Sequence, residues 1–377
     1  MKNIDKYRGC LIGGAAGDAL GFPIEFMEEG EIFERYGSEG IQAYQLTGNL
    51  AEISDDTQMS MFTAAGLLQG TTRGMTRGIM ASYPDYIKYA YHDWLLTQNA
   101  RYPLPENETH YSWLVTVPEL FSSRAPGNTC LDAIEAGCPG TIENPANRSK
   151  GSGGIMRVAP IGVYLDAVDG KYTYNAIQRI GAETAALTHG HELGYLPAAV
   201  LVHMVSELAH DPEATVEKAV YDAMTTLRET FPDKKSIAPL SKLVRKAVQL
   251  SKENLDDLDA IHQLGAGWVA EETLAIAIYC SLKYSTDFKK AVTAAVNHEG
   301  DSDSTGAVTG NIVGTFLGLS GIPSAFTDHL ELKDIILILA DDLYHDCQMT
   351  ANGENYDPDW DHKYIRNDYM TWKRQNQ

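Results

Sequence analysis

The chain has 377 residues, of which 44% are hydrophobic and 21% are charged, a composition typical of globular proteins. Its 51 acidic residues outnumber its 30 basic ones and give a formal net charge of −21. Such a charge argues against a binding surface for nucleic acid or for anionic membranes. An anionic substrate would therefore need local hydrogen-bond donors or metal ions.

The cysteines and the N-terminus predict the cellular compartment. Five cysteines form no Cys-x-x-Cys pair, and an odd number at this low density argues against a disulfide scaffold. Asp18 interrupts the apolar run near the N-terminus, which is untypical of a signal peptide. No apolar stretch reaches the roughly 18 residues that a membrane span needs. We therefore expect a cytoplasmic protein with no membrane partner.

Helical periodicity dominates the chain. Apolar residues recur with helical spacing, and Gly and Pro cluster between the periodic segments. The pattern predicts helices near residues 5–20, 57–69, 78–97, 129–136, 174–188, 194–209, 213–230, 236–251, 268–284, 287–298, 305–318 and 331–346. Residues 155–164 suit a short strand or the start of a buried helix equally well. The expected fold class is all-α, with the chemistry on the loops.

The domain organisation follows from the absence of a linker. No segment rich in Ser, Gly or Pro divides the chain, so residues 1–354 are expected to form a single all-α domain. Residues 71–125, rich in Tyr, Trp, Pro and Asn, look like an insertion. Residues 355–377 carry five Tyr and Trp side chains, too many for a free end, and this extension is expected to pack on the body.

Two acidic clusters carry the clearest chemical signal. They are Ser54-Asp55-Asp56 and Asp301-Ser302-Asp303-Ser304, and each stands just before a predicted helix. Either cluster alone is typical of helix capping, in which Asp and Ser accept hydrogen bonds from free backbone N–H groups. Together, four carboxylates and several hydroxyls form an all-oxygen set that suits two Mg²⁺ or Mn²⁺ ions. This interpretation requires that the fold bring the clusters together.

Other metal sites fit less well. The segment from Asp301 resembles the start of an EF-hand loop, but its twelfth position is Ile312 instead of Glu. Zinc is disfavoured, because the pair His189 and His191 has no Cys or His neighbour. Helical prenyl-diphosphate enzymes also bind Mg²⁺ through Asp-rich motifs. The segment after Asp55 lacks the third carboxylate of that motif, and this enzyme class stays the remote alternative.

Two glycine segments complete the set. The small residues of segment 13–21 indicate tight helix packing, and Glu25 on the loop that follows is a candidate acid or base. Segment 151–157 reads Gly-Ser-Gly-Gly-Ile-Met-Arg, and its successive N–H groups suit phosphate oxygens, although a flexible turn explains it equally well. Arg157 suits either a phosphate or a structural carboxylate.

These segments, in this order, resemble the ADP-ribosylglycohydrolase family. The matching motifs are Gly17-Asp18-Ala19-Leu20-Gly21 with Glu25, Ser54 to Met59, Pro126 to Thr129, Gly151 to Pro160, His189, Leu264 to Glu272, and Gly300 to Ser304. Each motif alone is weak, but the ordered combination over residues 5–320 is specific.

The resemblance implies an all-α orthogonal helical bundle with a binuclear Mg²⁺ or Mn²⁺ site. The implied metal ligands are Ser54, Asp55, Asp56, Asp301, Asp303 and Ser304. Family members usually have Thr in place of the two serines, which keeps the hydroxyl. Glu25 matches the catalytic or gating carboxylate of the family, and we assign Asp55 and Asp303 to catalysis as well. The implied ADP-ribose loops contain Gly127, Asn128, Ser152, Gly153, Gly154, Ile155, Met156 and His189.

The implied reaction is hydrolysis of the bond between ribose C1″ and an acceptor. ADP-ribosyl-arginine is the first expectation for the acceptor. Residues 98–125 contain no Asp, although the arginine-specific branch carries one in this loop, so serine-linked ADP-ribose and O-acetyl-ADP-ribose stay open. The alternative of another class is an inactive ADP-ribose-binding protein, against which the intact Asp clusters and Glu25 argue.

Overall fold

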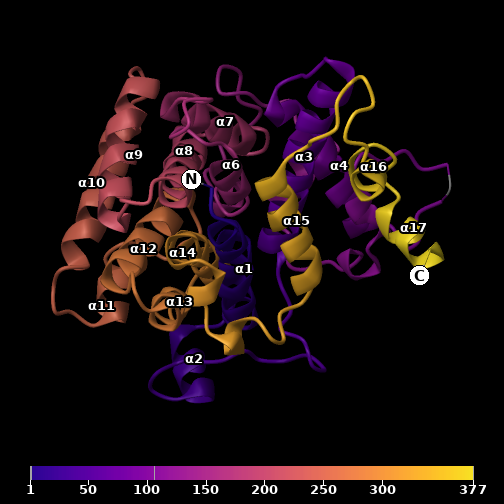
Figure 1. The fold of residues 1–377 in the computed structure, drawn as a ribbon. Coiled ribbons are helices and arrows are strands. Elements are labelled where there is room, and N and C mark those ends of the chain that lie inside the picture. The colour runs from indigo at the N-terminus through magenta and orange to yellow at the C-terminus, as the bar shows by residue number, and fades with distance from the viewer. Residues whose placement is uncertain (1, 106, 377) are drawn as a thin grey trace.

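The computed structural model describes residues 2–105 and 107–376. Over these residues it consists of helices joined by loops, with three isolated bridges and no strand (Figure 1). The first helices are α1 Ile4–Gly21, α2 Glu29–Tyr36, α3 Asp55–Arg77, α4 Tyr83–Asn99, α5 Asn128–Glu135, α6 Ala159–Tyr164, α7 Tyr174–Ala186, α8 Glu192–His210 and α9 Val216–Thr230. The others are α10 Ile237–Leu250, α11 Asp257–His262, α12 Ala270–Lys283, α13 Phe288–Val296, α14 Ser302–Leu317, α15 Lys333–His345, α16 Pro358–Tyr364 and α17 Tyr369–Gln375. The all-α prediction is confirmed.

Helices α1 and α14 pack antiparallel in backbone contact at the centre of the molecule (Figure 1). Each helix presents glycines spaced by four residues, which places them on one face. A Cβ on Gly13 would lie 2.3 Å from the Gly310 carbonyl oxygen, and one on Gly17 would lie 1.9 Å from that of Gly306. This confirms the tight packing predicted for segment 13–21. It also fixes the end of α1 beside the start of α14.

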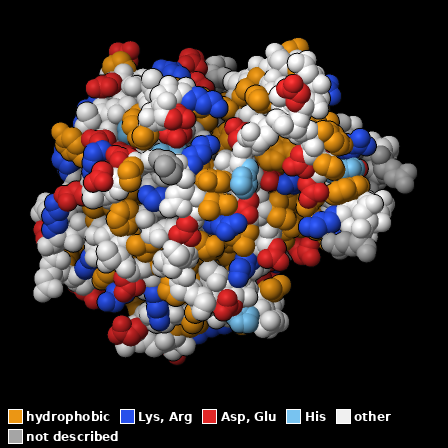
Figure 2. Space-filling model, in the orientation of Figure 1, with side chains coloured by type: hydrophobic (Ala, Val, Ile, Leu, Met, Phe, Trp, Pro, Cys, Tyr) orange, Lys and Arg blue, Asp and Glu red, His pale blue; other side chains and the backbone are white. Residues whose placement is uncertain are grey.

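The other helices surround this central pair. α8, α12 and α13 pack against α14, whereas α15 packs against α1 and α3 (Figure 1). The buried apolar side chains form one continuous core. On the face shown in Figure 2, acidic and basic side chains are interspersed. Among the described residues no single helix is long and apolar enough to span a membrane, and only the bent pair Ile4–Ile24 with Glu29–Tyr36 meets that test jointly.

Helix α3 extends further than the sequence pattern predicts. It runs to Arg77, where Gly78 in the left-handed region caps it, and Gly70, at which the predicted helix stops, packs against Tyr86 of α4. A Cβ on Gly66 would lie 2.7 Å from the Ile87 Cα atom. The start of segment 71–125 thus belongs to two long packed helices. For residues 155–164 the sequence suits a strand and a helix equally well. In the structure this segment ends in the helix α6.

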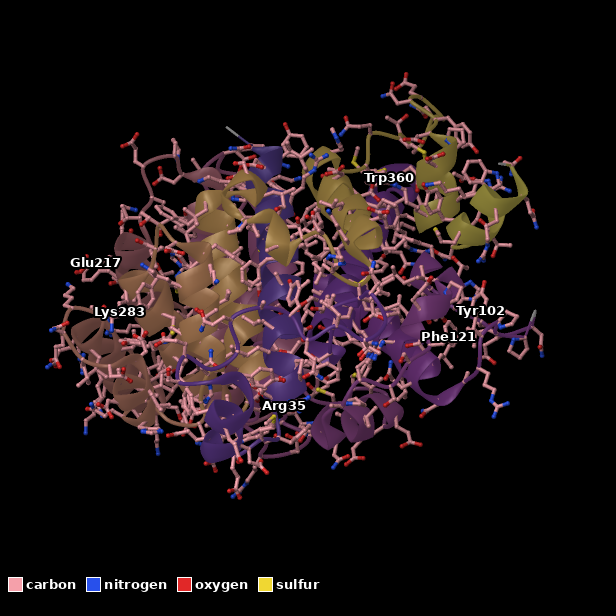
Figure 3. The ribbon with its side chains drawn as sticks, turned by 90° about the horizontal axis from the view of Figure 1, so that it is seen from below. Arg35, Tyr102, Phe121, Glu217, Lys283 and Trp360 are labelled. Carbon is pink, nitrogen blue, oxygen red and sulfur yellow. The ribbon has the colours of Figure 1, made fainter. Side chains whose placement is uncertain are left out.

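The C-terminal segment lies beside α3 and α4 (Figure 1). Trp360, labelled in Figure 3, is buried and donates its indole N–H to the Thr72 hydroxyl at 2.9 Å. Lys363 donates to both carboxylate oxygens of Asp342 at 2.6 and 2.7 Å, and the Tyr364 hydroxyl donates to the same carboxylate at 2.6 Å. α16 is therefore tied to α15 by a buried ion pair.

A second contact lies nearer to the C-terminus. Arg374 on α17 donates to the Tyr102 hydroxyl at 2.6 Å. The Tyr102 ring packs edge-on against Phe121, with ring centroids 5.3 Å apart (Figure 3). The tail and the loop between α4 and α5 thereby support each other.

Candidate active site

Three chain segments place carboxylates around one cavity of about 200 Å³. Asp55 and Asp56 stand in the first turn of α3. Asp301 caps α14 and Asp303 stands in its first turn. Glu25 follows a short 3-10 turn after α1. All five line the cavity and are largely buried, so the fold brings together the two acidic clusters that the sequence separates.

The electrostatics of these carboxylates fit a divalent cation. One oxygen from each of Glu25, Asp301 and Asp303 lies within 4.8 Å of the others. Burial raises the pKa of all five carboxyls, and the charge of Asp303 raises the pKa of the other four further. No lysine or arginine is among the described residues that line the cavity. Glu25 Oε2 and Asp56 Oδ2 have no hydrogen-bond partner. Hard oxygen ligands so arranged suit Mg²⁺ or Mn²⁺.

The two serines expected among the metal ligands occupy different positions. The Ser54 hydroxyl accepts a hydrogen bond from the Asp56 N–H at 3.2 Å and caps α3. Ser304 lines the cavity and Ser54 does not. The Ser304 N–H donates to Asp303 Oδ1 at 2.9 Å, and its hydroxyl lies 4.0 Å from the Met156 sulfur. Helix capping, the simpler interpretation of these motifs, is thus present together with the carboxylate cluster.

Asp18 is a site residue to which the sequence analysis assigns no role. It is fully buried on α1, and its carboxylate accepts the Ser54 N–H at 3.0 Å, the Thr57 N–H at 3.1 Å and the Thr57 hydroxyl. Burial and the charge of Asp303 raise its pKa. Asp18 therefore fastens the start of α3 to α1 and positions the first Asp pair. The signal in the sequence is a single charge inside an apolar, glycine-rich run.

The rest of the cavity lining, called the glycine wall below, contains the predicted ADP-ribose loops. Its lining residues include Gly127, Asn128, Ser152, Gly153, Met156 and His189. Gly154 and Ile155, also predicted to bind ADP-ribose, are buried and do not line the cavity. Burial and Asp303 raise the pKa of Asp301, and a hydrogen bond from the Ser152 side chain opposes this rise. The glycine turn and the second Asp pair are thus in direct contact.

Close packing of protein atoms explains why residue 153 of this wall is a glycine. A Cβ on Gly153 would lie 2.8 Å from the Cys130 sulfur and 2.9 Å from His189 Cε1. His189 Nδ1 lies 2.8 Å from the Thr188 hydroxyl oxygen, and burial, with Arg157 nearby, lowers the pKa of His189 to about 3. The neutral imidazole is part of the wall against which the glycine packs. A substitution at Gly153 would therefore disturb protein packing before any ligand contact.

Arg157 matches neither role that the sequence left open. It is completely buried, donates to the Thr188 hydroxyl at 2.6 Å and to the Cys130 sulfur at 3.3 Å, and has its guanidinium 4.5 Å from the Tyr91 ring centroid. It is not among the residues that line the cavity. Arg157 therefore packs beneath the residues that line the cavity and contacts neither a phosphate site nor a carboxylate.

A larger hollow of about 550 Å³ lies between α2, α11 and α13. Two of its carboxylates already have partners, because Asp257 pairs with Lys283 at 2.8 Å and Glu29 lies 2.7 Å from His262. Paired charges of this kind are ordinary surface features. We therefore place the active site at the smaller cavity.

A statistical model of the ADP-ribosylglycohydrolase family matches residues 1–353. The chain belongs to this family. It is 22% identical over 369 residues to ADP-ribosylhydrolase ARH3 of Bos taurus, covering 91% of this chain and 93% of that protein. It is 24% identical over 339 residues to ADP-ribosyl-[dinitrogen reductase] glycohydrolase of Rhodospirillum rubrum, covering 87% and 91%. A solved structure titled ADP-ribosylglycohydrolase-related protein complex has a TM-score of 0.59 at 22% identity, covering 91% of this chain and 98% of that one, which shows the same fold.

Family membership settles the class of enzyme. The chain is a glycosylase-type hydrolase that acts on the bond between ADP-ribose and an acceptor. Hydrolysis in this family is metal-dependent, which agrees with the cluster of Glu25, Asp301 and Asp303. The predicted family and enzyme class are confirmed, and the prenyl-diphosphate alternative has no support.

Proposed function

We propose that the chain hydrolyses the N-glycosidic bond between ADP-ribose and arginine on proteins and so reverses mono-ADP-ribosylation in the cytoplasm. The observation that carries the proposal is the convergence of five buried carboxylates on one cavity beside the glycine wall. An acidic cavity favours a cationic acceptor. The guanidinium of arginine carries a positive charge, whereas serine in O-glycosidic linkage and an acetyl ester do not.

The proposed metal ligands are Asp55, Asp56, Asp301 and Asp303, with the hydroxyls of Ser54 and Ser304. When bound, two Mg²⁺ or Mn²⁺ ions would supply Lewis-acid activation of the distal ribose and of the attacking water. Glu25 also stands close enough to Asp301 and Asp303 to share a cation with them. Without a cation, the mutual repulsion of these groups favours their protonated forms.

The remaining steps belong to the side chains and backbone of this chain. Glu25, with one carboxylate oxygen free of hydrogen bonds, is the group that moves a proton between water and the leaving nitrogen. Asp18 holds the start of α3 in place throughout. The Gly153 N–H and the first N–H groups of α5 are the donors to the diphosphate, and they compensate for the negative charge of the cavity.

The test is release of ADP-ribose from three substrates. These are an ADP-ribosyl-arginine peptide, an ADP-ribosyl-serine peptide and O-acetyl-ADP-ribose, each with EDTA-treated protein and after addition of Mg²⁺, Mn²⁺ or Zn²⁺. We expect fastest release from the arginine peptide with Mg²⁺ or Mn²⁺, and none with EDTA or Zn²⁺. Faster release from the serine peptide or the ester would replace arginine as the acceptor. Release from none of the three would defeat the proposed activity.

A further inference from the structure

An exposed aromatic pair stands at the mouth of the active-site cavity. Phe26 is 72% exposed and Trp268 is 43% exposed. Their ring centroids are 5.9 Å apart and their planes differ by 22°, which is a stacked arrangement. Large apolar side chains left together at the surface mark interaction sites more often than single ones do. The proposed roles of the carboxylates and of the glycine wall make no use of this pair.

The two rings come from two loops that are far apart in the sequence. Phe26 directly follows Glu25, the proposed proton-transfer group. Trp268 lines the cavity together with the carboxylates, and its carbonyl oxygen accepts the Ser152 N–H at 3.3 Å. The pair therefore joins the loop that carries Glu25 to the loop that packs on the glycine turn.

The loop that carries Trp268 is held in place. Gly267 adopts a φ of +82°, and the Glu272 carboxylate accepts the N–H groups of Ala266 and Gly267 at 3.0 and 3.3 Å. The Asp301 N–H donates to the Ala266 carbonyl oxygen at 2.9 Å. The backbone next to Trp268 is thus fixed beside the second Asp pair, and Trp268 lines the same cavity as that pair.

We propose that Trp268, supported by the Phe26 ring stacked on it, is the platform on which the guanidinium of the acceptor arginine lies. This inference rests on the proposed arginine-linked activity. A guanidinium is planar and weakly hydrated, and it stacks on aromatic faces, of which Trp is the strongest partner. The O-glycosidic bond to serine offers no planar group, and neither it nor an acetyl ester carries a positive charge.

The experiment compares two substitutions of the same ring. Trp268→Leu keeps apolar bulk but removes the π-face, whereas Trp268→Phe keeps a π-face. kcat and KM are measured on arginine-linked and serine-linked ADP-ribosyl peptides, and the affinity for free ADP-ribose is measured by calorimetry. We expect Trp268→Leu to raise the KM of the arginine substrate roughly 5- to 20-fold, in line with a partly desolvated cation–π contact. Trp268→Phe should recover most of this loss.

Two further variants sharpen the comparison. Phe26→Leu should raise the same KM roughly two- to fivefold, because Phe26 supports the platform from its other side. Tyr221→Ala is the matched control, since Tyr221 is 71% exposed on α9, far along the chain from every cavity-lining residue, and its KM should equal that of the unmodified protein.

Each contrary result has its own meaning. An unchanged KM in Trp268→Leu, with an unmodified protein that hydrolyses the arginine peptide, would overturn the platform and leave the proposed function standing. An equal loss of affinity for free ADP-ribose would assign the ring to the ADP-ribose half of the substrate and overturn the platform as well. An unmodified protein inactive on the arginine peptide would overturn both proposals at once.

Discussion

The buried carboxylate of Asp342 and the buried carboxylates of the active-site cavity differ in how their charge is balanced. On α15, Asp342 receives two hydrogen bonds from Lys363 and one from Tyr364. In the active-site cavity, five carboxylates meet with no lysine or arginine among the described lining residues. A buried charge is costly unless it is paired. Asp342 holds the tail on the body, and the five carboxylates of the cavity are where we propose that cations bind.

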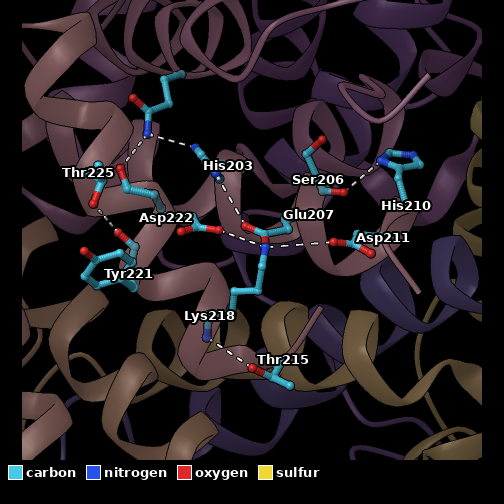
Figure 4. Close-up of polar contacts among 12 residues, drawn as sticks. His203, Ser206, Glu207, His210, Asp211, Thr215, Lys218, Tyr221, Asp222 and Thr225 are labelled. Atoms are coloured by element: carbon cyan, nitrogen blue, oxygen red, sulfur yellow. Dashed lines mark hydrogen bonds and ion pairs between the residues drawn. The ribbon is translucent and has the colours of Figure 1, made fainter. Parts of the chain in front are cut away.

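A third cluster follows the same pattern as Asp342. Glu207, buried on α8, pairs with Lys218 of α9, and Lys218 also lies 2.8 Å from Asp222 and 3.9 Å from Asp211 (Figure 4). His203 Nε2 lies 3.6 Å from the second Glu207 oxygen. Buried carboxylates at these two helix contacts have a cationic side chain as partner. The carboxylates of the cavity differ from these two in having no such partner, and the following predictions test the contrast.

The largest effect is expected at the centre of the unbalanced cluster. Asp303→Ala should abolish hydrolysis, a loss of at least about 10³-fold, because Asp303 interacts with all the other carboxylates of the site. The fold should persist, since the helical core does not depend on this side chain, and circular dichroism checks this. Hydrolysis near the unmodified rate in Asp303→Ala would remove the metal site from the proposal.

The second prediction concerns proton transfer. Glu25→Gln keeps the shape of the side chain but cannot carry a proton at neutral pH. We expect kcat to fall roughly 10²- to 10⁴-fold, the usual scale for general acid–base catalysis, with ADP-ribose affinity largely kept. Steady-state kinetics and calorimetry separate the two quantities. A preserved kcat with weaker binding would make Glu25 a ligand or a gate.

The third prediction breaks the balanced cluster instead. Asp342→Asn leaves Lys363 buried without a carboxylate, so the free energy of unfolding should fall by about 3 kcal/mol. Urea denaturation measures this loss, and hydrolysis at low temperature should remain close to normal. An unchanged midpoint would mean that the tail is not held by this ion pair.

The fourth prediction is the smallest and has the opposite sign. Burial, and then the charges of Asp303 and Asp55, raise the pKa of Asp56, so its charged form is disfavoured in the folded state. Asp56→Asn removes the cost of burying or protonating this carboxyl, so it should raise the free energy of unfolding of the metal-free protein. Asp342→Asn is the matched isosteric control, with a loss instead of a gain. A loss in both variants would contradict the contrast between the clusters.

Sequence patterns predict most of the helical core because apolar periodicity and glycine spacing are local. α1 was expected at residues 5–20 and runs over Ile4–Gly21. The sequence pattern did not predict the short helices α2, α11, α16 and α17, because one or two amphipathic turns give little periodic signal. α14 begins at Ser302 instead of 305, since Asp301 caps it with its side chain.

The carboxylates of the site could be predicted from the sequence, but the residues that hold them in position could not. The two Asp pairs are visible as motifs, because cap residues stand at helix starts in any fold. The role of Asp18 depends on contacts 36 and 39 residues away, with Ser54 and Thr57, which no local pattern reveals. The Phe26 and Trp268 stack joins residues far apart in sequence, and only the packed structure shows it.

The most direct test of the unbalanced cluster is the thermal stability of EDTA-treated protein as Mg²⁺ or Mn²⁺ is added. A cation that binds only the folded state raises Tm with concentration. We predict that Tm rises in the unmodified protein and rises equally in Asp342→Asn, because Asp342 does not line the cavity. In Asp303→Ala the Tm should stay constant. Two results together would contradict a metal-dependent active site at these carboxylates. The Tm of the unmodified protein would not change with millimolar Mg²⁺ or Mn²⁺, and EDTA would not affect hydrolysis.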